Sequence, residues 1–255
     1  MATPPYSVVQ VDVVRLPAGT AEPDRVAVEE PLEIRIAGEP VAVTMRTPGH
    51  DEELALGFAL TEGLQPVRAS LPADLAANTV DVDAEGTIAP RNFYTSSSCG
   101  VCGKGALEAV RVEAPPVESD LRVTSALVAD LPERLRAGQA AFEVTGGLHA
   151  TGLFDEAGEL LCLREDVGRH NAMDKVIGWA FGQGLLPLSR RLLCVSGRLS
   201  FELVQKAAVG GCPLLAGVGA PSSLAVELAE AQGITLCGFV RGGSLTVYSG
   251  ASRVS

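Results

Sequence analysis

The 255-residue chain lacks several features that would assign it to a common functional class. No apolar run approaches the roughly 18 residues needed to cross a bilayer, and the first residues have neither the basic nor the apolar region of a signal peptide. Basic residues number 20 against 31 acidic ones, and a net charge of −11 disfavours broad binding to nucleic acids or anionic membranes. We therefore expect a cytoplasmic protein with no nucleic-acid partner and no membrane partner.

Ligands for a structural metal are also scarce. The chain has three histidines and six cysteines, and only Cys99 and Cys102 show the CxxC spacing. A zinc site would need a second such pair or distant ligands, so we expect no metal and no zinc, with half of a zinc site as the alternative. The other four cysteines lie singly in apolar stretches and are expected to be small core residues of a protein from a reducing compartment.

The cysteine pair is the most reactive feature that the chain does have. Cys99-Gly-Val-Cys102-Gly follows a small, polar run, and residues 104–113 have helical periodicity. Both thiols are therefore expected at or just before a helix N-terminus, where the helix dipole stabilises a thiolate. Arg91 and Lys104 add positive charge nearby. A thiolate attacks, carries sulfane sulfur or binds metal, so a thioredoxin-type redox pair stays an alternative to a sulfur carrier.

Residues 1–116 are predicted to form a small α+β domain that ends with the CxxC segment, and Pro115-Pro116 marks the expected boundary. Alternating apolar residues predict strands, and acidic residues after Pro48-Gly49 predict the start of a helix. Residues 17–23 are expected to be irregular. The predicted elements are a β-hairpin at 32–45, a helix at 51–62 and a strand near 79–82.

Residues 117–255 alternate short apolar strands with amphipathic helices. This order is typical of an α/β domain with a mostly parallel sheet. The predicted strands are 160–163, 191–195, 213–217 and 234–240, and the predicted helices are 173–181, 201–209 and 224–231.

Glycine, serine or arginine follows each of these predicted strands. Parallel sheets bind ligands outside the carboxyl ends of their strands, and such loops suit phosphate oxygens, so we predict a nucleotide or pyrophosphate ligand there. Glycine and serine are also ordinary turn and cap residues, so a structural role stays open for each loop. His149, placed just before the first of these strands, is a further candidate for lining the site. The candidate binding residues are His170, Arg198, Ser222, Ser223, Arg241, Gly242, Gly243 and Ser244.

Five motifs of the chain stand out, at residues 47–58, 96–103, 164–175, 196–202 and 238–241. Together they resemble the motifs of the formate dehydrogenase accessory sulfurtransferases, the FdhD family, and the likeness runs over nearly the whole chain. The CxxC motif alone would not be specific enough to indicate this family.

The resemblance implies a sulfurtransferase that accepts sulfur from a cysteine desulfurase as a persulfide. Cys99 is then the carrier and Cys102 its partner, and the sulfur passes to the bis(molybdopterin guanine dinucleotide) molybdenum cofactor for formate dehydrogenase. GDP is expected to mimic one arm of this cofactor, and a homodimer is expected. A cofactor-binding chaperone without sulfur transfer and a dithiol oxidoreductase remain the alternatives. The cofactor-binding run implied by the family is Phe239, Val240, Arg241, Gly242, Gly243 and Ser244.

The resemblance also implies a fold. The C-terminal domain is expected to be three-layered and cytidine-deaminase-like. The zinc-ligand motif of the deaminases is missing from the sequence, because Gly211-Cys212-Pro213 has the wrong order, so deamination is not expected.

Overall fold

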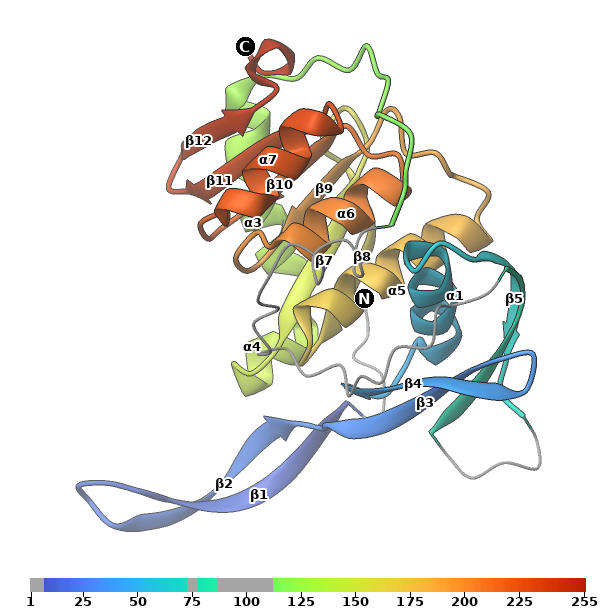
Figure 1. The fold of residues 1–255 in the computed structure, drawn as a ribbon. Coiled ribbons are helices and arrows are strands. Elements are labelled where there is room, and N and C mark those ends of the chain that lie inside the picture. The colour runs from blue at the N-terminus through green and yellow to red at the C-terminus, as the bar shows by residue number, and fades with distance from the viewer. Residues whose placement is uncertain (1–6, 73–77, 87–111) are drawn as a thin grey trace.

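The computed structural model describes residues 7–72, 78–86 and 112–255, and the structural statements below refer to these residues. They form a four-stranded sheet, a six-stranded sheet and a separate two-stranded hairpin (Figure 1). Pro115 and Pro116 lie in an irregular segment, and the division of the chain into two domains there stays a prediction. None of the helices in the described ranges combines the length and apolarity needed to span a bilayer.

The four-stranded sheet has the order β4-β3-β6-β5, and α1 packs on it. Leu32, Ile34, Val80 and Val82 are fully buried against this helix, which explains the alternation that predicts these strands. The predicted hairpin, helix and strand are confirmed, whereas β5 was not predicted. The elements are β3 (Glu30–Ile36), β4 (Glu39–Arg46), α1 (Asp51–Thr61), β5 (Gln65–Ser70) and β6 (Thr79–Glu85).

A second hairpin extends away from the rest of the molecule (Figure 1). β1 (Val8–Arg15) and β2 (Thr20–Ala27) pair antiparallel along their whole length. The expectation that residues 17–23 are irregular is therefore wrong for the part that β2 contains. Pro23 is tolerated because β2 is an edge strand, on which one row of backbone positions needs no N–H partner.

The C-terminal part is a three-layer arrangement around the six-stranded sheet, whose order is β12-β11-β10-β9-β7-β8 (Figure 1). One apolar cluster joins the sheet to α5, α6 and α7, and a second joins its other face to α3. The strands are β7 (His149–Phe154), β8 (Leu160–Asp166), β9 (Leu192–Val195), β10 (Leu214–Gly217), β11 (Thr235–Arg241) and β12 (Ser244–Ser249). The helices are α3 (Ser125–Gly138), α4 (Ala140–Thr145), α5 (Arg169–Gly182), α6 (Phe201–Val209) and α7 (Ser223–Ala231).

The strands predicted from the sequence, β8, β9, β10 and β11, all run in one direction. The sheet is nevertheless not mostly parallel in its pairings. Only β9–β10 and β10–β11 are parallel pairs, because β7 is inserted between β8 and β9 in the opposite direction and β12 returns from β11 in a hairpin. The expectation is therefore wrong for the pairing but correct for the common direction of the four predicted strands.

The two parts of the molecule meet where α1 packs on α5. A Cβ atom at Gly57 would lie 1.9 Å from the carbonyl oxygen of Asp174, and one at Gly178 would lie 1.9 Å from the carbonyl oxygen of Glu53. The two glycines therefore allow the helix backbones to touch, which no residue with a Cβ would permit. This contact holds the four-stranded sheet against the C-terminal layers.

Candidate functional site

Four strand ends meet at one edge of the six-stranded sheet, because β8, β9, β10 and β11 share one direction. We call this the carboxyl edge. It comprises residues 167–170, 196–200, 218–223 and 239–244, together with His149. His149 is predicted to lie just before a strand, but it is the first residue of β7 and lies opposite Asp166 at this edge. The loops predicted to bind a ligand are thus brought to a common edge.

Two arginines at the carboxyl edge make no ion pair with any described residue. Arg169 is the first residue of α5, and its buried Nε has no hydrogen-bond partner there. Arg198 follows β9, is exposed, and makes no hydrogen bond within the described ranges. A guanidinium without a carboxylate partner remains available for an oxyanion, with which it forms short, charge-assisted hydrogen bonds. Arg198 is among the predicted binding residues, and Arg169 is not.

The same positive charge acts on His149. Burial lowers the pKa of His149 below its usual 6.5, and the charges of Arg169, His170 and Arg198 lower it further, against the opposing effect of Asp166. The imidazole is therefore neutral at neutral pH, and it lies in a region of positive potential.

His170, a predicted binding residue, lies at the carboxyl edge but already has partners. Its Nε2 lies 2.8 Å from the carboxylate of Glu202 and 3.3 Å from the hydroxyl of Ser200. This contact with His170 lowers the pKa of Glu202 despite the burial of the carboxyl group. Ser200 is the N-cap residue of α6, but its side chain makes no capping hydrogen bond.

The two predicted serines lie at the start of α7. Ser222 is the N-cap residue, and its hydroxyl accepts a hydrogen bond of 3.3 Å from the backbone N–H of Ala225. Ser223 is the first residue of the helix and is exposed. Ser222 therefore has the structural role that the sequence analysis leaves open for these loops, while the hydroxyl of Ser223 faces solvent.

The run 239–244 forms the end of β11 and its turn into β12. Phe239 is 40% exposed, with a positive φ of 52° at an irregularity in the pairing, and the Arg241 guanidinium lies 5.9 Å from its ring centre. Gly242 and Gly243 both have positive φ, as a two-residue hairpin turn requires. Ser244 donates its hydroxyl to the carbonyl of Arg241 at 3.0 Å. In contrast, the side chain of Val240 is fully buried against α3.

A cavity of about 600 Å³ adjoins the carboxyl edge. It lies between the strand ends and the α3–α4 corner, where the Arg136 guanidinium lies 4.6 Å from the ring centre of Phe142. His149 lines it together with Ser196, whose hydroxyl oxygen accepts a hydrogen bond from the backbone N–H of Ala150 at 2.9 Å. The cavity therefore offers the ring of Phe142, a neutral imidazole and a hydroxyl proton, whereas Arg169 and Arg198 are not among the residues that line it.

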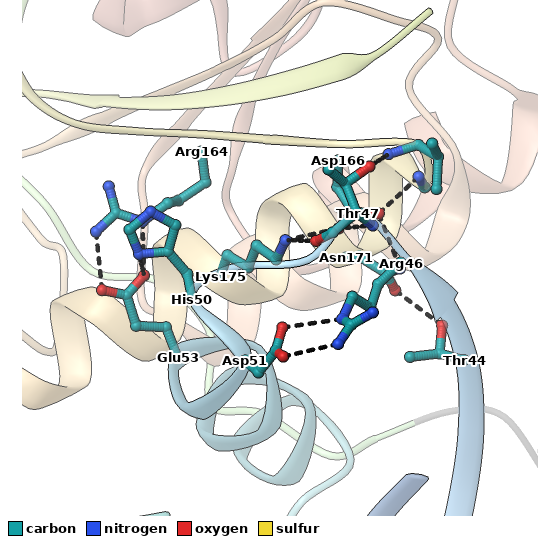
Figure 2. A network of polar contacts seen from close by, with 12 residues as sticks. Thr44, Arg46, Thr47, His50, Asp51, Glu53, Arg164, Asp166, Asn171 and Lys175 are labelled. Atoms are coloured by element: carbon teal, nitrogen blue, oxygen red, sulfur yellow. Dashed lines mark hydrogen bonds and ion pairs between the residues drawn. The ribbon is translucent and has the colours of Figure 1, made fainter. Parts of the chain in front are cut away.

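Most polar residues of the 47–58 and 164–175 motifs lie elsewhere, at the contact between the two parts of the molecule (Figure 2). The Lys175 ammonium lies 2.7 Å from the carboxylate of Asp166 and donates to the carbonyl of Thr47 at 2.8 Å. Both charged side chains are at most 1% exposed. Asp166 also accepts from the backbone N–H groups of Thr47 and Gly168. A buried ion pair with all these partners joins the two sheets.

A second ion pair supports this contact, and another joins β4 to α1 within the N-terminal part (Figure 2). Arg164 donates two hydrogen bonds to Glu53, of 2.6 and 2.8 Å. Burial alone would raise the pKa of Glu53, but the hydrogen bonds from Arg164 and His50 outweigh it and lower that pKa. Arg46 binds Asp51 in the same two-pronged manner, at 3.0 and 2.9 Å.

Lys206 of α6 makes a third buried pair at this contact. Its ammonium lies 2.7 and 2.8 Å from the two carboxylate oxygens of Asp174 and donates to the hydroxyl of Thr61 at 2.9 Å. Together with Lys175, this accounts for two of the three lysines of the chain.

Cys99 and Cys102 lie outside the described residues, as do Arg91, Lys104 and most of the predicted helix at 104–113. Its last two residues, Val112 and Glu113, are described and are not helical. The other four cysteines are core residues, as predicted. Burial raises the pKa of the Cys162, Cys212 and Cys237 thiols to about 12, and it raises the pKa of the Cys194 thiol further.

The residues on either side of the undescribed segment approach one another. Gly86 packs beside Leu64, and the side chain of Val112 lies against Gly63. The backbone N–H of Val112 also donates to the side-chain carbonyl of Gln205 on α6, at 2.9 Å. The segment that carries the cysteine pair thus begins and ends beside the C-terminal end of α1.

No group of three or more metal-binding side chains occurs among the residues that the structure describes. The expectation of no zinc concerns Cys99 and Cys102 above all, so it stays a prediction.

Comparison with known proteins gives a consistent result. Residues 27–255 match the model of the FdhD/NarQ family. The sulfur carrier protein FdhD of Streptomyces coelicolor is 52% identical, over 95% of this chain and 94% of its own length. The sulfur carrier protein FdhD of Sulfolobus acidocaldarius is 44% identical, over 91% of both chains.

A solved structure has the same fold. It is the crystal structure of a protein from Desulfotalea psychrophila described as a formate dehydrogenase accessory protein. The two structures superpose with a TM-score of 0.76 at 25% sequence identity, over 97% of this chain and 98% of the other.

Proposed function

The chain belongs to the FdhD/NarQ family, and from this premise we propose that it carries sulfur as a persulfide on Cys99 during the maturation of formate dehydrogenase. The observation that carries the proposal is the cysteine pair itself, in a chain similar to sulfur carrier proteins. The burial of the other four cysteines supports it, because their raised pKa values leave little thiolate at neutral pH.

Sulfur is loaded by thiol–persulfide exchange. The Cys99 thiolate attacks the terminal sulfur of a persulfide on a cysteine desulfurase, a new S–S bond forms, and the old S–S bond breaks. The desulfurase cysteine leaves as a thiolate, so the exchange consumes no oxidant or reductant. A persulfide is more acidic than a thiol, so the loaded Cys99 is an anion at neutral pH.

The acceptor is the molybdenum of the bis(molybdopterin guanine dinucleotide) cofactor, which is a substrate here. Release of the terminal sulfur as sulfide needs two electrons, and Cys102 supplies them when its thiolate attacks the inner sulfur of Cys99. A Cys99–Cys102 disulfide forms and hydrosulfide leaves. Exchange of this sulfur for an oxo group on molybdenum releases that oxygen as water, so the metal keeps its oxidation state.

We propose the carboxyl edge as the site that holds this cofactor, with the run from Phe239 to Ser244, Arg198, Ser222, Ser223 and His170. The unpaired guanidinium of Arg198 and the exposed pair of Phe239 and Arg241 support this placement. Val240 takes part only through its backbone, because its side chain is in the core. GDP serves as the mimic of one arm. The cytidine-deaminase-like character of the C-terminal layers, the homodimer and the cytoplasmic location are part of the same proposal.

The loading step is tested by incubating the protein with a cysteine desulfurase and cysteine, and then mapping the added sulfur by mass spectrometry. We expect a 32-Da adduct on Cys99 in the wild type and in Cys162→Ala, the matched control at a buried cysteine. Cys99→Ala should take up no sulfur and should not support formate dehydrogenase activity. If Cys99→Ala still accepts sulfur and supports activity, Cys99 is not the carrier.

The two alternatives give different results in the same system. A cofactor-binding chaperone would support formate dehydrogenase activity even when Cys99 and Cys102 are both replaced by serine. A dithiol oxidoreductase would catalyse disulfide exchange with model substrates in the absence of a desulfurase. The proposed carrier should do neither.

A further inference from the structure

His149 lies beside two arginines whose charge no described carboxylate neutralises. His149 pairs with Asp166, three residues before Arg169 at the start of α5, and a Cβ at Gly197, next to Arg198, would lie 3.4 Å from the Nδ1 of His149. These arginines, together with His170, disfavour a positive charge on the ring. The acidic group that favours protonation of His149 is Asp166 of β8, whose carboxylate is already paired with a buried lysine and with backbone N–H groups. The site therefore lacks an anion.

The remaining charged groups nearby are paired with each other. His170 contacts Glu202 of α6, which also feels the charge of Arg169. On the α3–α4 side of the cavity, Arg136 binds Glu143 at 2.6 Å. Neither carboxylate is within ion-pair distance of Arg169 or Arg198, so none of these pairs compensates the two free arginines.

We infer that the carboxyl edge binds a phosphate group between Arg169 and Arg198, and that His149 gains a proton when this group binds. Neither Arg169 nor His149 is part of the proposed cofactor site above. The inference deepens that site, and it rests on the proposed function only for the source of the phosphate. The shared chemistry is a phosphate oxyanion, carried either by a nucleotide or by free pyrophosphate.

The physical reason is the change in the charge around the imidazole of His149 when a phosphate binds. In the free protein, the two guanidinium groups disfavour the imidazolium form of His149. A bound phosphate supplies acceptors to both arginines and places negative charge beside the imidazole, so the charged form becomes favourable. A proton then moves from solvent to the unprotonated ring nitrogen, and binding and protonation strengthen each other. Affinity therefore rises as the pH falls through the pKa of His149 in the complex, and it levels off below the pKa of His149 in the free protein.

The histidine spectrum reports this directly, because the chain has only three histidines. Their ring signals in a carbon–proton NMR spectrum are assigned by the loss of one signal in His149→Gln. We expect the titration midpoint of His149 below 6.5 without ligand and at a higher pH with saturating inorganic pyrophosphate or GDP. His50, which contacts Glu53 at the start of α1, is the internal control and should not shift.

Binding itself is measured by calorimetry in buffers of different ionisation enthalpy. The wild type should take up more protons per pyrophosphate bound than His149→Gln does. Arg169→Gln combined with Arg198→Gln should weaken pyrophosphate binding on the order of a hundredfold or more, since each lost charge-assisted contact costs about tenfold or more. Arg25→Gln, on the exposed strand β2, is the matched control and should bind normally.

Several outcomes would overturn the inference: pyrophosphate and GDP both fail to bind, His149 keeps its midpoint on binding, or the double arginine variant binds normally. GDP that binds much more tightly than pyrophosphate identifies a nucleotide as the source, and equal affinities identify the free anion. Sulfur uptake by Cys99 is measured separately. A protein that loads Cys99 but fails here disproves this inference alone, whereas one that shows the His149 shift but loads no sulfur disproves the carrier function alone.

Discussion

The contact between α1 and α5 and the carboxyl edge of the sheet use the same motif for opposite purposes. At the contact, Arg164 binds Glu53 and Lys175 binds Asp166, so each of these charges has a partner. At the carboxyl edge, Arg169 of the same motif has none among the described residues. Five positions separate Arg164 from Arg169, yet the first joins two parts of the molecule and the second is available to a ligand.

This difference shows how structural and ligand-binding charges can be told apart within one motif. A buried ion pair is fully compensated by its neighbours, and breaking it costs stability. An uncompensated charge at a sheet edge adds little to stability and instead favours a ligand of the opposite sign. The comparison predicts that substitutions at the contact change the free energy of unfolding, and that substitutions at the edge change ligand affinity.

The largest effect is expected at the buried pair. Lys175→Met leaves the carboxylate of Asp166 buried without its cation, which typically costs about 3–5 kcal/mol of unfolding free energy. Urea denaturation measures this loss. Arg190→Met is the control at an exposed arginine that also has two acidic partners, and its effect should be near the limit of measurement. Equal losses in the two variants would contradict the structural role of the contact.

The next effect concerns the helix backbones. Gly57→Ala places a Cβ 1.9 Å from the carbonyl oxygen of Asp174, and this overlap forces the helices apart at a cost of about 1–3 kcal/mol or more. Gly182→Ala, at the end of α5, meets no atom within 4 Å and should leave stability unchanged or slightly higher. Thermal unfolding of both variants checks the prediction, and an unaffected Gly57→Ala would show that the helices do not pack this closely.

At the carboxyl edge, Arg198→Ala and Arg241→Ala should each weaken GDP binding roughly ten- to a hundredfold, because each removes one charge-assisted contact. Calorimetry measures the affinity, and the unfolding free energy should stay close to that of the wild type. Unchanged affinity in both folded variants would move the nucleotide site elsewhere, without affecting the proposed role of Cys99.

The smallest effect is a pH dependence of stability. The pKa of His149 is lower in the folded protein than its usual 6.5, so the unfolded chain binds more protons in the interval between these values. The unfolding free energy should therefore decrease as the pH falls below 6.5, by less than about 1.4 kcal/mol per pH unit. Denaturation at pH 7.5 and 5.5 should show a smaller decrease in His149→Gln, and an equal decrease would contradict the neutral state of His149.

Much of the C-terminal fold could be predicted because its buried strands are short apolar runs between capped helices. Strands β7 and β12 were missed for different reasons. β7 has a glycine at position 152, because a Cβ there would meet Phe154 and Leu135. This glycine interrupts the apolar pattern that would otherwise predict the strand. β12 follows the two-glycine turn, for which the sequence predicts a ligand loop. Helix α3 was missed because Pro132 interrupts its pattern.

The candidate site was predictable in its location but not in its members. Strand direction alone brings Arg198, Ser222 and Arg241 to one edge. The sequence does not distinguish Arg164 from Arg169, because only the packing of α1 on α5 supplies Glu53 to the first and not to the second. Likewise, the partner of His170 is Glu202, which lies on the next helix and depends on how α5 and α6 pack.

One paired measurement tests the central comparison most directly: the unfolding free energy and the GDP affinity of Arg164→Gln and Arg169→Gln. The same chemical change is made twice in one motif. We expect Arg164→Gln to lose about 3 kcal/mol of stability while the folded protein binds GDP normally. Arg169→Gln should keep its stability and bind GDP at least about tenfold more weakly. Normal GDP binding by Arg169→Gln, or a loss of stability as large as that of Arg164→Gln, would contradict the account.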